Sequence, residues 1–237
     1  MTNDSPSGGP AWPTSLRDGL GAAWPVYIGY VPIGLAFGVL AQKAGLGPFQ
    51  VGLMSLLVFA GSAQFIAVSM LAAGAGAPAV VTTTFVVNLR HLLMSSSLAP
   101  HLNQAGRDRL FLFAHGVTDE SFAVNHARFS QGGWHWRPAM VVNQSTCVVW
   151  VAATMIGAWA GRFIPKGALG MDYALIAMFL CLLVFQLRGR RHWITAGLSG
   201  SLAVAISLWL PGNAYVILAT LLAATLGMLA TRGGKAR

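Results

Sequence analysis

Residues 44–89 read AGLGPFQVGLMSLLVFAGSAQFIAVSMLAAGAGAPAVVTTTFVVNL, and no Asp, Glu, Lys or Arg interrupts them between Lys43 and Arg90. A helix needs about 20 apolar residues to cross the hydrocarbon core of a bilayer, so this stretch has the length of two spans. A Gly- and Pro-containing turn at 74–78 divides it. The stretch predicts an all-α, polytopic membrane protein.

Two further uncharged runs, 138–161 and 192–231, extend this pattern. Only 9% of the 237 residues are charged, whereas a soluble domain carries about 25%. Such a chain cannot cover its surface with polar groups, so its solvent must be lipid. The runs and the turn signals between them predict a transmembrane helical bundle of about seven spans. The expected spans are 20–42, 50–73, 79–99, 137–161, 169–188, 192–210 and 213–231.

The chain is expected to form one transmembrane domain, 19–231, between two tails. Residues 1–18 are polar and rich in Pro, Gly and Ser, which predicts a disordered tail and no cleavable signal peptide. Residues 232–237 form a basic C-terminal tail. Cys147 and Cys181 both lie inside apolar runs, where small core residues are expected.

The net charge of +9 does not indicate a nucleic-acid partner. The Lys and Arg residues stand at the ends of apolar runs, where they orient membrane helices, and they form no cluster interleaved with aromatic residues. Counting them places the loop at 188–191 and the C-terminus in the cytoplasm. The side of the N-terminus depends on whether the segment 107–128 crosses the membrane.

The segment 107–128 has an apolar side but holds Asp119 and Glu120 near its centre. It could span the membrane, re-enter from one side, or lie at the interface. Only the last two options keep both carboxylates away from membrane depth, although polar residues at that depth are often functional. We therefore expect about seven spans plus one polar helix at 107–128, which is either re-entrant or an additional helix.

A continuous helix over this segment would place His115, Asp119, Phe122 and His126 on one face. A histidine beside an aspartate can relay protons, and it could also form half of a metal site. No His-Glu-x-x-His motif or cysteine cluster supports a metal, so none is expected. A solvated interfacial helix is the structural alternative.

Spans 20–42 and 50–73 each contain polar or helix-breaking residues. Pro32 lies beside Tyr30 and frees a backbone carbonyl one turn earlier. Transporters use such interruptions to bind substrates or ions, and a simple kink is the alternative. Gly61 exposes backbone that a ligand could approach, next to Ser62 and Gln64. Since an unpaired amide in hydrocarbon costs several kcal/mol, these residues contact either a substrate or another helix.

Span 79–99 carries Asn88 and His91 on a polar stripe, with Arg90 beside them. Placing an arginine at the bilayer centre costs at least about 2.5–3.5 kcal/mol, so Arg90 needs a partner. That partner could be Asp119, Glu120 or a carboxylate of the substrate.

Two small-xxx-small pairs, Gly34 with Gly38 and Gly157 with Gly161, favour close approach of helices. The polar patch at 143–146, Asn-Gln-Ser-Thr, could line a cavity.

Four segments together resemble the AzlC-type family of branched-chain amino acid exporters. They are GYVPIGLAFG at 29–38, VFAGSAQF at 58–65, NLRH at 88–91 and TDE at 118–120, in matching order and spacing. The resemblance begins near residue 15 and covers most of the chain. It implies the large subunit of a permease that exports leucine, isoleucine, valine and, as a further candidate, methionine. It also implies a small AzlD-type membrane partner and an ion or proton gradient as the driving force. Phe185 departs from the proline expected in many relatives, which puts a helix break there in doubt.

We therefore expect a secondary exporter in the inner membrane that is not an enzyme and needs no cofactor. No phosphate-binding loop of the Gly-x-x-x-x-Gly-Lys type is present, so ATP hydrolysis is not expected. The alternatives are a non-transporting assembly subunit and an intramembrane enzyme that uses His115, Asp119 and His126. The candidate substrate-binding residues are Tyr30, Pro32, Gly61, Ser62, Gln64, Asn88 and Arg90, and the candidates for proton or ion coupling are His91, His115, Asp119 and Glu120.

Overall fold

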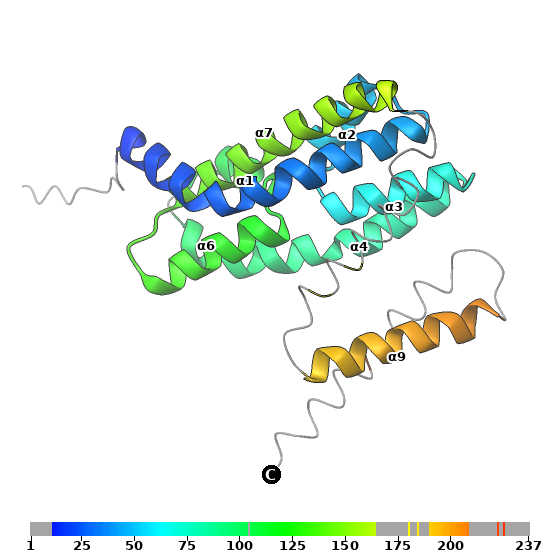
Figure 1. The fold of residues 1–237 in the computed structure, drawn as a ribbon. Helices are drawn as coiled ribbons and strands as arrows, with labels where there is room; N and C mark the ends of the chain where they lie inside the picture. Colours follow the sequence, from blue (N-terminus) through cyan, green and yellow to red (C-terminus); the bar gives the residue numbers. More distant parts are fainter. Residues whose placement is uncertain are drawn as a thin grey trace, which may run out of the picture. The chain divides into compact units, whose positions relative to one another are not determined.

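The computed structural model describes residues 11–103, 105–164 and 190–208, with four isolated positions, Leu180, Val184, Leu222 and Thr225. Every regular element in this part of the chain is a helix, which confirms the all-α class (Figure 1). The chain divides into two compact units. The first comprises Met1–Gly76 with Val87–Met171, and the second comprises Ala77–Val86 with Asp172–Arg237.

Helix α1 (Trp12–Lys43) runs without interruption over 32 residues. It begins inside the range 1–18 that composition assigned to a tail, with a proline in its first turn, where no intrahelical hydrogen bond is lost. Pro25 and Pro32 lie inside the helix and do not end it. Membrane helices tolerate proline because neighbouring groups re-satisfy the freed backbone, so the interruption considered at Pro32 is absent from α1.

Helix α7 (Trp136–Ala160) packs parallel to α1 along its length (Figure 1). At one end, which we name end A, the rings of Trp12 and Trp136 meet edge to face with centroids 5.8 Å apart. At the other, end B, Lys43 donates a hydrogen bond of 2.9 Å to the carbonyl of Gly161. The two helices therefore run side by side from end A to end B, and the positions of the other elements can be given relative to these two ends.

Glycines allow the two backbones to approach closely. A Cβ atom at Gly34 would lie 2.8 Å from the Cβ of Ala153, and one at Gly38 would overlap the backbone of Gly157. A Cβ at Gly161 of the segment after α7 would lie 3.2 Å from the Cα atom of Val39 on α1. The close approach predicted from the two small-xxx-small pairs is confirmed, and Gly38 and Gly157 meet directly.

The expected single span over 50–73 is wrong. The chain forms two half-helices there, α2 (Pro48–Leu57) and α3 (Gly61–Ala72). Phe59 turns the chain between them with a φ of 36°, a left-handed conformation that a bulky residue rarely adopts.

The two half-helices form a hairpin that enters from end B. Helix α2 starts after the turn that follows Lys43, and at the tip the ring of Phe59 lies 6.5 Å from that of Tyr30, in the middle of α1. Helix α3 leads back, because Phe65 packs on Phe37, which is nearer end B (centroids 4.9 Å apart). The half-helices are only about 15 and 18 Å long, so neither can cross a core of about 30 Å.

Helix α4 (Ala77–Leu98) continues into a short 3-10 helix, η1 (Ala99–Leu102), and agrees with the expected span 79–99. Its last turns lie at end A, where Leu98 packs in the cluster that contains Trp136.

The segment 107–128 is also broken, into α5 (Arg107–His115) and α6 (Asp119–Gln131). At end A, Arg109 at the start of α5 lies 5.1 Å from the ring of Trp136, and Phe129 near the end of α6 stacks on His101 at 4.6 Å. Of the three arrangements considered, the chain adopts the re-entrant one. A second hairpin therefore enters from the end opposite to the first.

Three described helices have the length and apolar composition to cross a membrane: α1, α4 extended through η1, and α7. Helix α7 agrees with the expected span 137–161. Helix α9 (Arg190–Ser207) covers most of the range expected for the span 192–210, and its apolar part is the shorter stretch Trp193–Ile206. The spans expected at 169–188 and 213–231, together with Cys181 and Phe185, lie outside the described residues.

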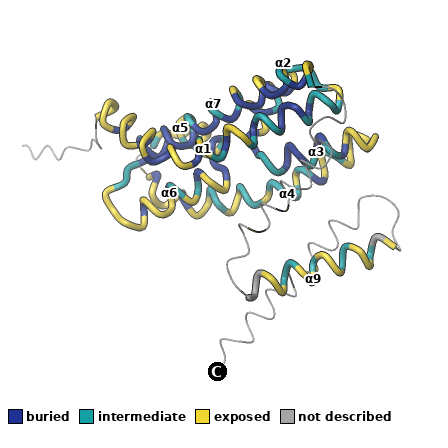
Figure 2. Tube along the Cα trace, viewed as in Figure 1, coloured by how far each residue is buried: buried dark blue, intermediate teal, exposed yellow. Residues whose placement is uncertain are grey.

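Large apolar side chains cover the outside of the first unit. Trp24 and Ile28 on α1 are 63% and 61% exposed, and Val148 and Trp159 on α7 are exposed as well. Figure 2 shows buried positions on the sides of α1 and α7 that face each other. An outer surface this apolar suits lipid rather than water, as the composition predicted.

Replacing Gly38 by alanine should destabilise the protein by about 1–3 kcal/mol, because the added methyl group overlaps the backbone of α7. Gly29 of the same helix has nothing within 4 Å of an added Cβ and serves as the matched control. Thermal unfolding in detergent should show a lower Tm for Gly38→Ala and an unchanged or higher Tm for Gly29→Ala. Equal Tm values would contradict the backbone-to-backbone contact.

Candidate functional site

The two hairpin tips meet beside Tyr30 in the middle of α1. This side chain is only 6% exposed. Its hydroxyl donates to the carboxylate of Glu120 at 2.8 Å and lies 2.8 Å from the hydroxyl of Thr118, both at the start of α6. Its ring contacts Phe59 at the other tip. A single α1 residue therefore contacts both hairpins.

Arg90 on α4 joins the beginnings of the two returning half-helices. Its Nη1 atom lies 2.7 Å from Oδ2 of Asp119, the first residue of α6. Its Nη2 atom donates to the hydroxyl of Ser62, the second residue of α3. Asp119 is the carboxylate that the sequence required for Arg90, which confirms one of the partners considered. The two side chains remain 33% and 48% exposed, so the pair is accessible.

His115 makes a direct link between the tips. Its Nε2 atom lies 2.8 Å from the carbonyl oxygen of Leu56, at the end of α2, and its ring stacks on Phe59 with centroids 6.3 Å apart. The last carbonyls of a half-helix have no partner inside that helix. A side chain of one hairpin thus satisfies a carbonyl of the other.

Side chains of α7 add hydrogen bonds to the end of α5, where the N–H of Gly116 also donates to the last carbonyls. Asn143 donates to the carbonyl of Phe113 at 2.9 Å, and Gln144 donates to that of Leu112 at 2.8 Å. Asn143 is fully buried and also accepts from Asn125 of α6 at 2.9 Å. The polar patch at 143–146 therefore begins with residues that hold the second hairpin, rather than with an open cavity lining.

The two hairpin tips differ in charge. Helix α6 begins with Asp119 and Glu120, and Thr118 caps it by accepting from the backbone of Ser121. Helix α3 begins at Gly61 with no side-chain cap and no acidic residue in its first turn. A helix N-terminus carries a partial positive charge, which together with the guanidinium of Arg90 makes the start of α3 electropositive. At the start of α6 the carboxylates of Asp119 and Glu120 outweigh this partial charge and make the tip electronegative.

Gln64 lies away from the tips, in the core. Its Nε2 donates to Ser55 at 3.1 Å, its Oε1 accepts from the indole of Trp150 at 2.9 Å, and Ser55 is bonded in turn to Thr154 at 2.8 Å. Gln64 is fully buried, so this network joins α2, α3 and α7. The interhelical reading of Gln64 agrees with these contacts.

The structure brings six of the predicted residues together: Tyr30, Ser62, Arg90, His115, Asp119 and Glu120. Gly61 adjoins them at the start of α3, where the ring of Trp150 would lie 3.6 Å from an added Cβ. Pro32 is exposed on α1.

On α4, Asn88 Oδ1, Arg90 Nε and His91 Nε2 are shielded from solvent and have no hydrogen-bond partner among the described residues.

The expected common face of His115, Asp119, Phe122 and His126 is wrong, because the helix ends at His115 and restarts at Asp119. Only the rings of Phe122 and His126, both on α6, stack together, with centroids 5.3 Å apart. No group of three or more His, Cys, Asp or Glu residues in the described ranges could hold a metal ion.

Sequence reasoning missed the breaks at Val58–Ala60 and Gly116–Thr118, and with them the roles of Phe59 and Thr118. Two signals were present. Thr118 and Ser121 have the spacing of a capping box, and small residues follow Phe59. Neither signal distinguishes a hairpin from a kinked span without the tertiary contacts.

These features define a multi-pass helical membrane protein whose polar residues gather where two re-entrant hairpins meet. The chain belongs to the AzlC protein family, whose model matches residues 25–164. That range includes both hairpins, most of α1 and all of α4 and α7, so the family region contains the whole site.

Relatives in other organisms agree with this assignment. The chain is 31% identical to the inner membrane protein YgaZ of Escherichia coli (strain K12), over 86% of each chain. It is 28% identical to the branched-chain amino acid transport protein AzlC of Bacillus subtilis (strain 168), over 86% of this chain and 80% of the relative. An uncharacterized membrane protein of Archaeoglobus fulgidus is 31% identical over 81% of this chain and 85% of the relative. No solved structure matches the chain.

Arg90 and Asp119 should behave as a coupled pair in stability measurements. Arg90→Gln leaves the Asp119 carboxylate without its cation, and Asp119→Asn leaves the guanidinium without its anion, so each should lower Tm. The double variant should lose less than the sum of the single losses. Thermal unfolding of the four proteins in one detergent measures the coupling. Additive losses would show that the pair makes no energetic contribution.

Proposed function

We propose that this protein is a secondary active exporter of branched-chain amino acids across the inner membrane. Leucine, isoleucine and valine are the expected substrates, with methionine as a further candidate. The name of the Bacillus subtilis relative, a branched-chain amino acid transport protein, supports the substrate class, and that of the Escherichia coli relative, an inner membrane protein, supports the membrane. The observation that carries the proposal is the Arg90–Asp119 pair where the hairpin tips meet.

An amino acid carries a carboxylate and an ammonium group, and the two tips offer the complementary charges. The substrate carboxylate would bind Arg90 and the uncapped start of α3, at Gly61 and Ser62. The ammonium would bind Asp119 or Glu120 at the start of α6.

Substrate binding and opening of the ion pair are then one exchange. Arg90 and Asp119 neutralise each other at 2.7 Å. A zwitterion inserted between them gives each group a new partner of opposite charge. The exchange leaves no charge unpaired in a low-dielectric site, where an unpaired charge would be costly. The rings of Tyr30, Phe59 and Trp150 pack together beside the pair and are buried, so an aliphatic side chain would reach them when a hairpin moves.

Alternating access follows from hairpins that enter from opposite ends. Moving the α2/α3 hairpin would open the site toward end B, and moving the α5/α6 hairpin would open it toward end A. The helices α1 and α7, which glycine contacts hold together, would remain fixed. In the arrangement described here, the His115 bond to Leu56 and the two bonds of Arg90 hold both hairpins closed.

Coupling to a proton gradient would use titratable groups at the tips. Glu120 is bonded to Tyr30 and Asp119 to Arg90, so protonation of either carboxylate weakens a contact that holds a hairpin. A change in the protonation of His115 would alter its bond to Leu56 of α2. His91 would carry protons from its position on α4. Pro32, Gln64 and Asn88 would act by shaping α1, the hairpin core and α4 respectively.

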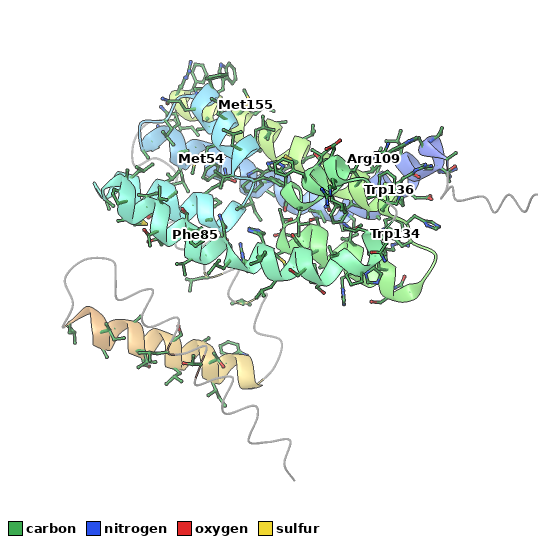
Figure 3. The ribbon with its side chains drawn as sticks, turned by 180° about the vertical axis from the view of Figure 1, so that it is seen from behind. Met54, Phe85, Arg109, Trp134, Trp136 and Met155 are labelled. Carbon is green, nitrogen blue, oxygen red and sulfur yellow. The ribbon has the colours of Figure 1, made fainter. Side chains whose placement is uncertain are left out.

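End A is proposed to face the cytoplasm. It carries Arg17, Arg107, Arg109, Arg128 and Arg137, whereas end B carries Lys43 and Arg162. Figure 3 shows Arg109, Trp134 and Trp136 together at this end. With α1, α4 and α7 and the spans expected at 169–188, 192–210 and 213–231, both termini would be cytoplasmic. A small AzlD-type subunit is the proposed membrane partner, with this chain as the large subunit of the permease.

Arg90→Gln should reduce export of branched-chain amino acids at least tenfold, because the substrate carboxylate loses its cation. Arg162→Gln at end B is the matched control and should export at the wild-type rate. Efflux is measured from proteoliposomes loaded with leucine, isoleucine, valine or methionine, with and without the small subunit. Wild-type efflux by Arg90→Gln at equal protein content would remove Arg90 from the mechanism. Failure of every protein to move any of these solutes would favour a non-transporting role.

A reversible cross-link between the two hairpin tips should stop transport. Cysteines replace Leu56 and His115 in a background without Cys147 and Cys181, and a short cleavable dithiol reagent joins them. The reference is the efflux of the same cysteine variant before cross-linking, because His115 is itself replaced. Efflux should fall from that level to the background and return to it when the reagent is cleaved. Cysteines at Trp12 and Trp136, on the fixed helices, provide the control pair, and their cross-link should leave efflux unchanged. Continued efflux with the tips joined would exclude hairpin gating.

A further inference from the structure

A pocket of about 430 Å³ lies at end A, apart from the hairpin tips. Its lining comes from the start of α1 and from the end of α6 with the turn that follows it. The lining residues are Arg17, Asp18, Gly21, Ala22, Arg128, Gln131, Gly132, Gly133 and Trp134. The transport mechanism proposed above uses none of them.

Three glycines leave one part of this pocket without side chains. A Cβ atom added at Gly21, Gly132 or Gly133 would have nothing within 4 Å, so the space beside each is open. Gly132 and Gly133 have φ values of 80° and 74°, which L side chains rarely adopt. The turn that borders the pocket thus requires glycine for its conformation and also keeps the pocket open.

The arginines in the pocket have donors to offer. Neither Arg17 nor Arg128 forms an ion pair with any residue in the described part of the chain. The guanidinium of Arg128 lies over the ring of Trp134, 5.4 Å from its centroid. Contact through its face leaves the in-plane N–H groups of a guanidinium free for an anion.

A buried network holds the aromatic platform in place. The indole of Trp134 donates to Asn125 at 3.1 Å, and Asn125 donates to Asn143 of α7. Asn125 and Asn143 are both fully buried. The position of Arg128 is therefore supported by the same polar network that holds the second hairpin.

The charges in the pocket define the class of ligand. Arg17 and Arg128 with Asp18 give a net charge of +1 (two cations and one anion). A single phosphodiester carries the matching charge of −1. The pocket lies at the end of the bundle, where Trp12, Trp134 and Trp136 gather as tryptophans do at a membrane interface.

The surface next to the pocket distinguishes a lipid from free phosphate. Arg17, Gly21, Trp24 and Ile28 fall on one face of α1, at intervals of four, three and four residues. Trp24 and Ile28 are 63% and 61% exposed. An acyl chain leaving the pocket can run along these two side chains toward the middle of the membrane.

We propose that this pocket binds the phosphodiester headgroup of an anionic phospholipid, with Arg17 and Arg128 on the phosphate and the acyl chains along Trp24 and Ile28. Basic pockets at the ends of membrane helices suit such headgroups. Bound lipid would join the start of α1 to the end of α6 and so hold the base of the second hairpin. The proposal does not depend on the transported substrate.

Native mass spectrometry of the full chain in detergent tests this site. The protein is titrated with phosphatidylglycerol, phosphatidylethanolamine or inorganic phosphate. The wild type should retain phosphatidylglycerol, and Arg17→Gln/Arg128→Gln should weaken its binding at least tenfold. Arg162→Gln, which removes one arginine at the other end, should bind as the wild type does. Asp18→Asn should bind more tightly, because it removes the anion from the pocket.

Three results would overturn the proposal. Equal binding of phosphatidylglycerol by the double variant and the wild type would exclude the two arginines. Equal retention of phosphatidylethanolamine would exclude selection by net charge. Competition by inorganic phosphate at the concentration of the lipid would indicate a free-anion site. If the double variant does not fold, as judged by Tm, the single variant Arg128→Gln replaces it, with an expected threefold loss.

Discussion

The contact between the backbones of α1 and α7 supports everything else in the first unit. It exists because Gly34 and Gly38 of α1, together with Gly157 and Gly161, lie against the opposite helix so closely that an added Cβ atom would overlap it or press against it. In lipid, apolar side chains gain little by leaving one hydrocarbon surface for another, so close packing of small residues must provide much of the association. Both hairpins rest against this helix pair, through Ser55 with Thr154 on one side and Asn143 with Phe113 on the other.

The ends of the half-helices expose backbone polar groups inside the membrane, and these groups need hydrogen-bond partners. A helix that stops in the middle of a membrane leaves carbonyl and N–H groups without partners, and lipid offers none. Here His115, Asn143 and Gln144 satisfy carbonyls at the ends of α2 and α5. The start of α6 is capped by Thr118, whereas the start of α3 has no side-chain cap. Arg90 contacts both tips, but only the start of α3 has neither a side-chain cap nor a carboxylate, so an anionic ligand would be most favourable there.

The sequence predicted the membrane class, the helices α1, α4 and α7, and the need of Arg90 for a carboxylate. These follow from local rules: apolar length, helix-packing glycines and the cost of an unpaired charge. The hairpins could not be predicted in the same way. A run of 24 uncharged residues at 50–73 satisfies the length of one span as well as that of two half-helices. The decision rests on Phe59, whose left-handed backbone is stabilised by contacts with Tyr30 and His115, far away in the chain.

The same distance in sequence explains why the site was only partly recognised. Gln64 has the polarity of a ligand-binding residue, but its partners are Ser55 and Trp150, which no spacing rule connects. Tyr30 and Glu120 lie 90 residues apart and are bonded to each other. Polarity inside a span shows that a residue must have a partner, and only the fold determines whether that partner is protein or solute.

The long interval between α1 and α7 also affects biosynthesis. Tyr27 and its partner Ser145 are 118 residues apart, so a ribosome adding about 5–20 residues per second needs roughly 6 to 24 s to supply the second after the first. During that time both half-helix pairs have been synthesised and the wall they rest on is incomplete. The tips, with Arg90 and the carboxylates of α6, must then be kept from lipid by water or by the insertion machinery. Completion of α7 is therefore the step at which the wall against which both hairpins pack becomes available.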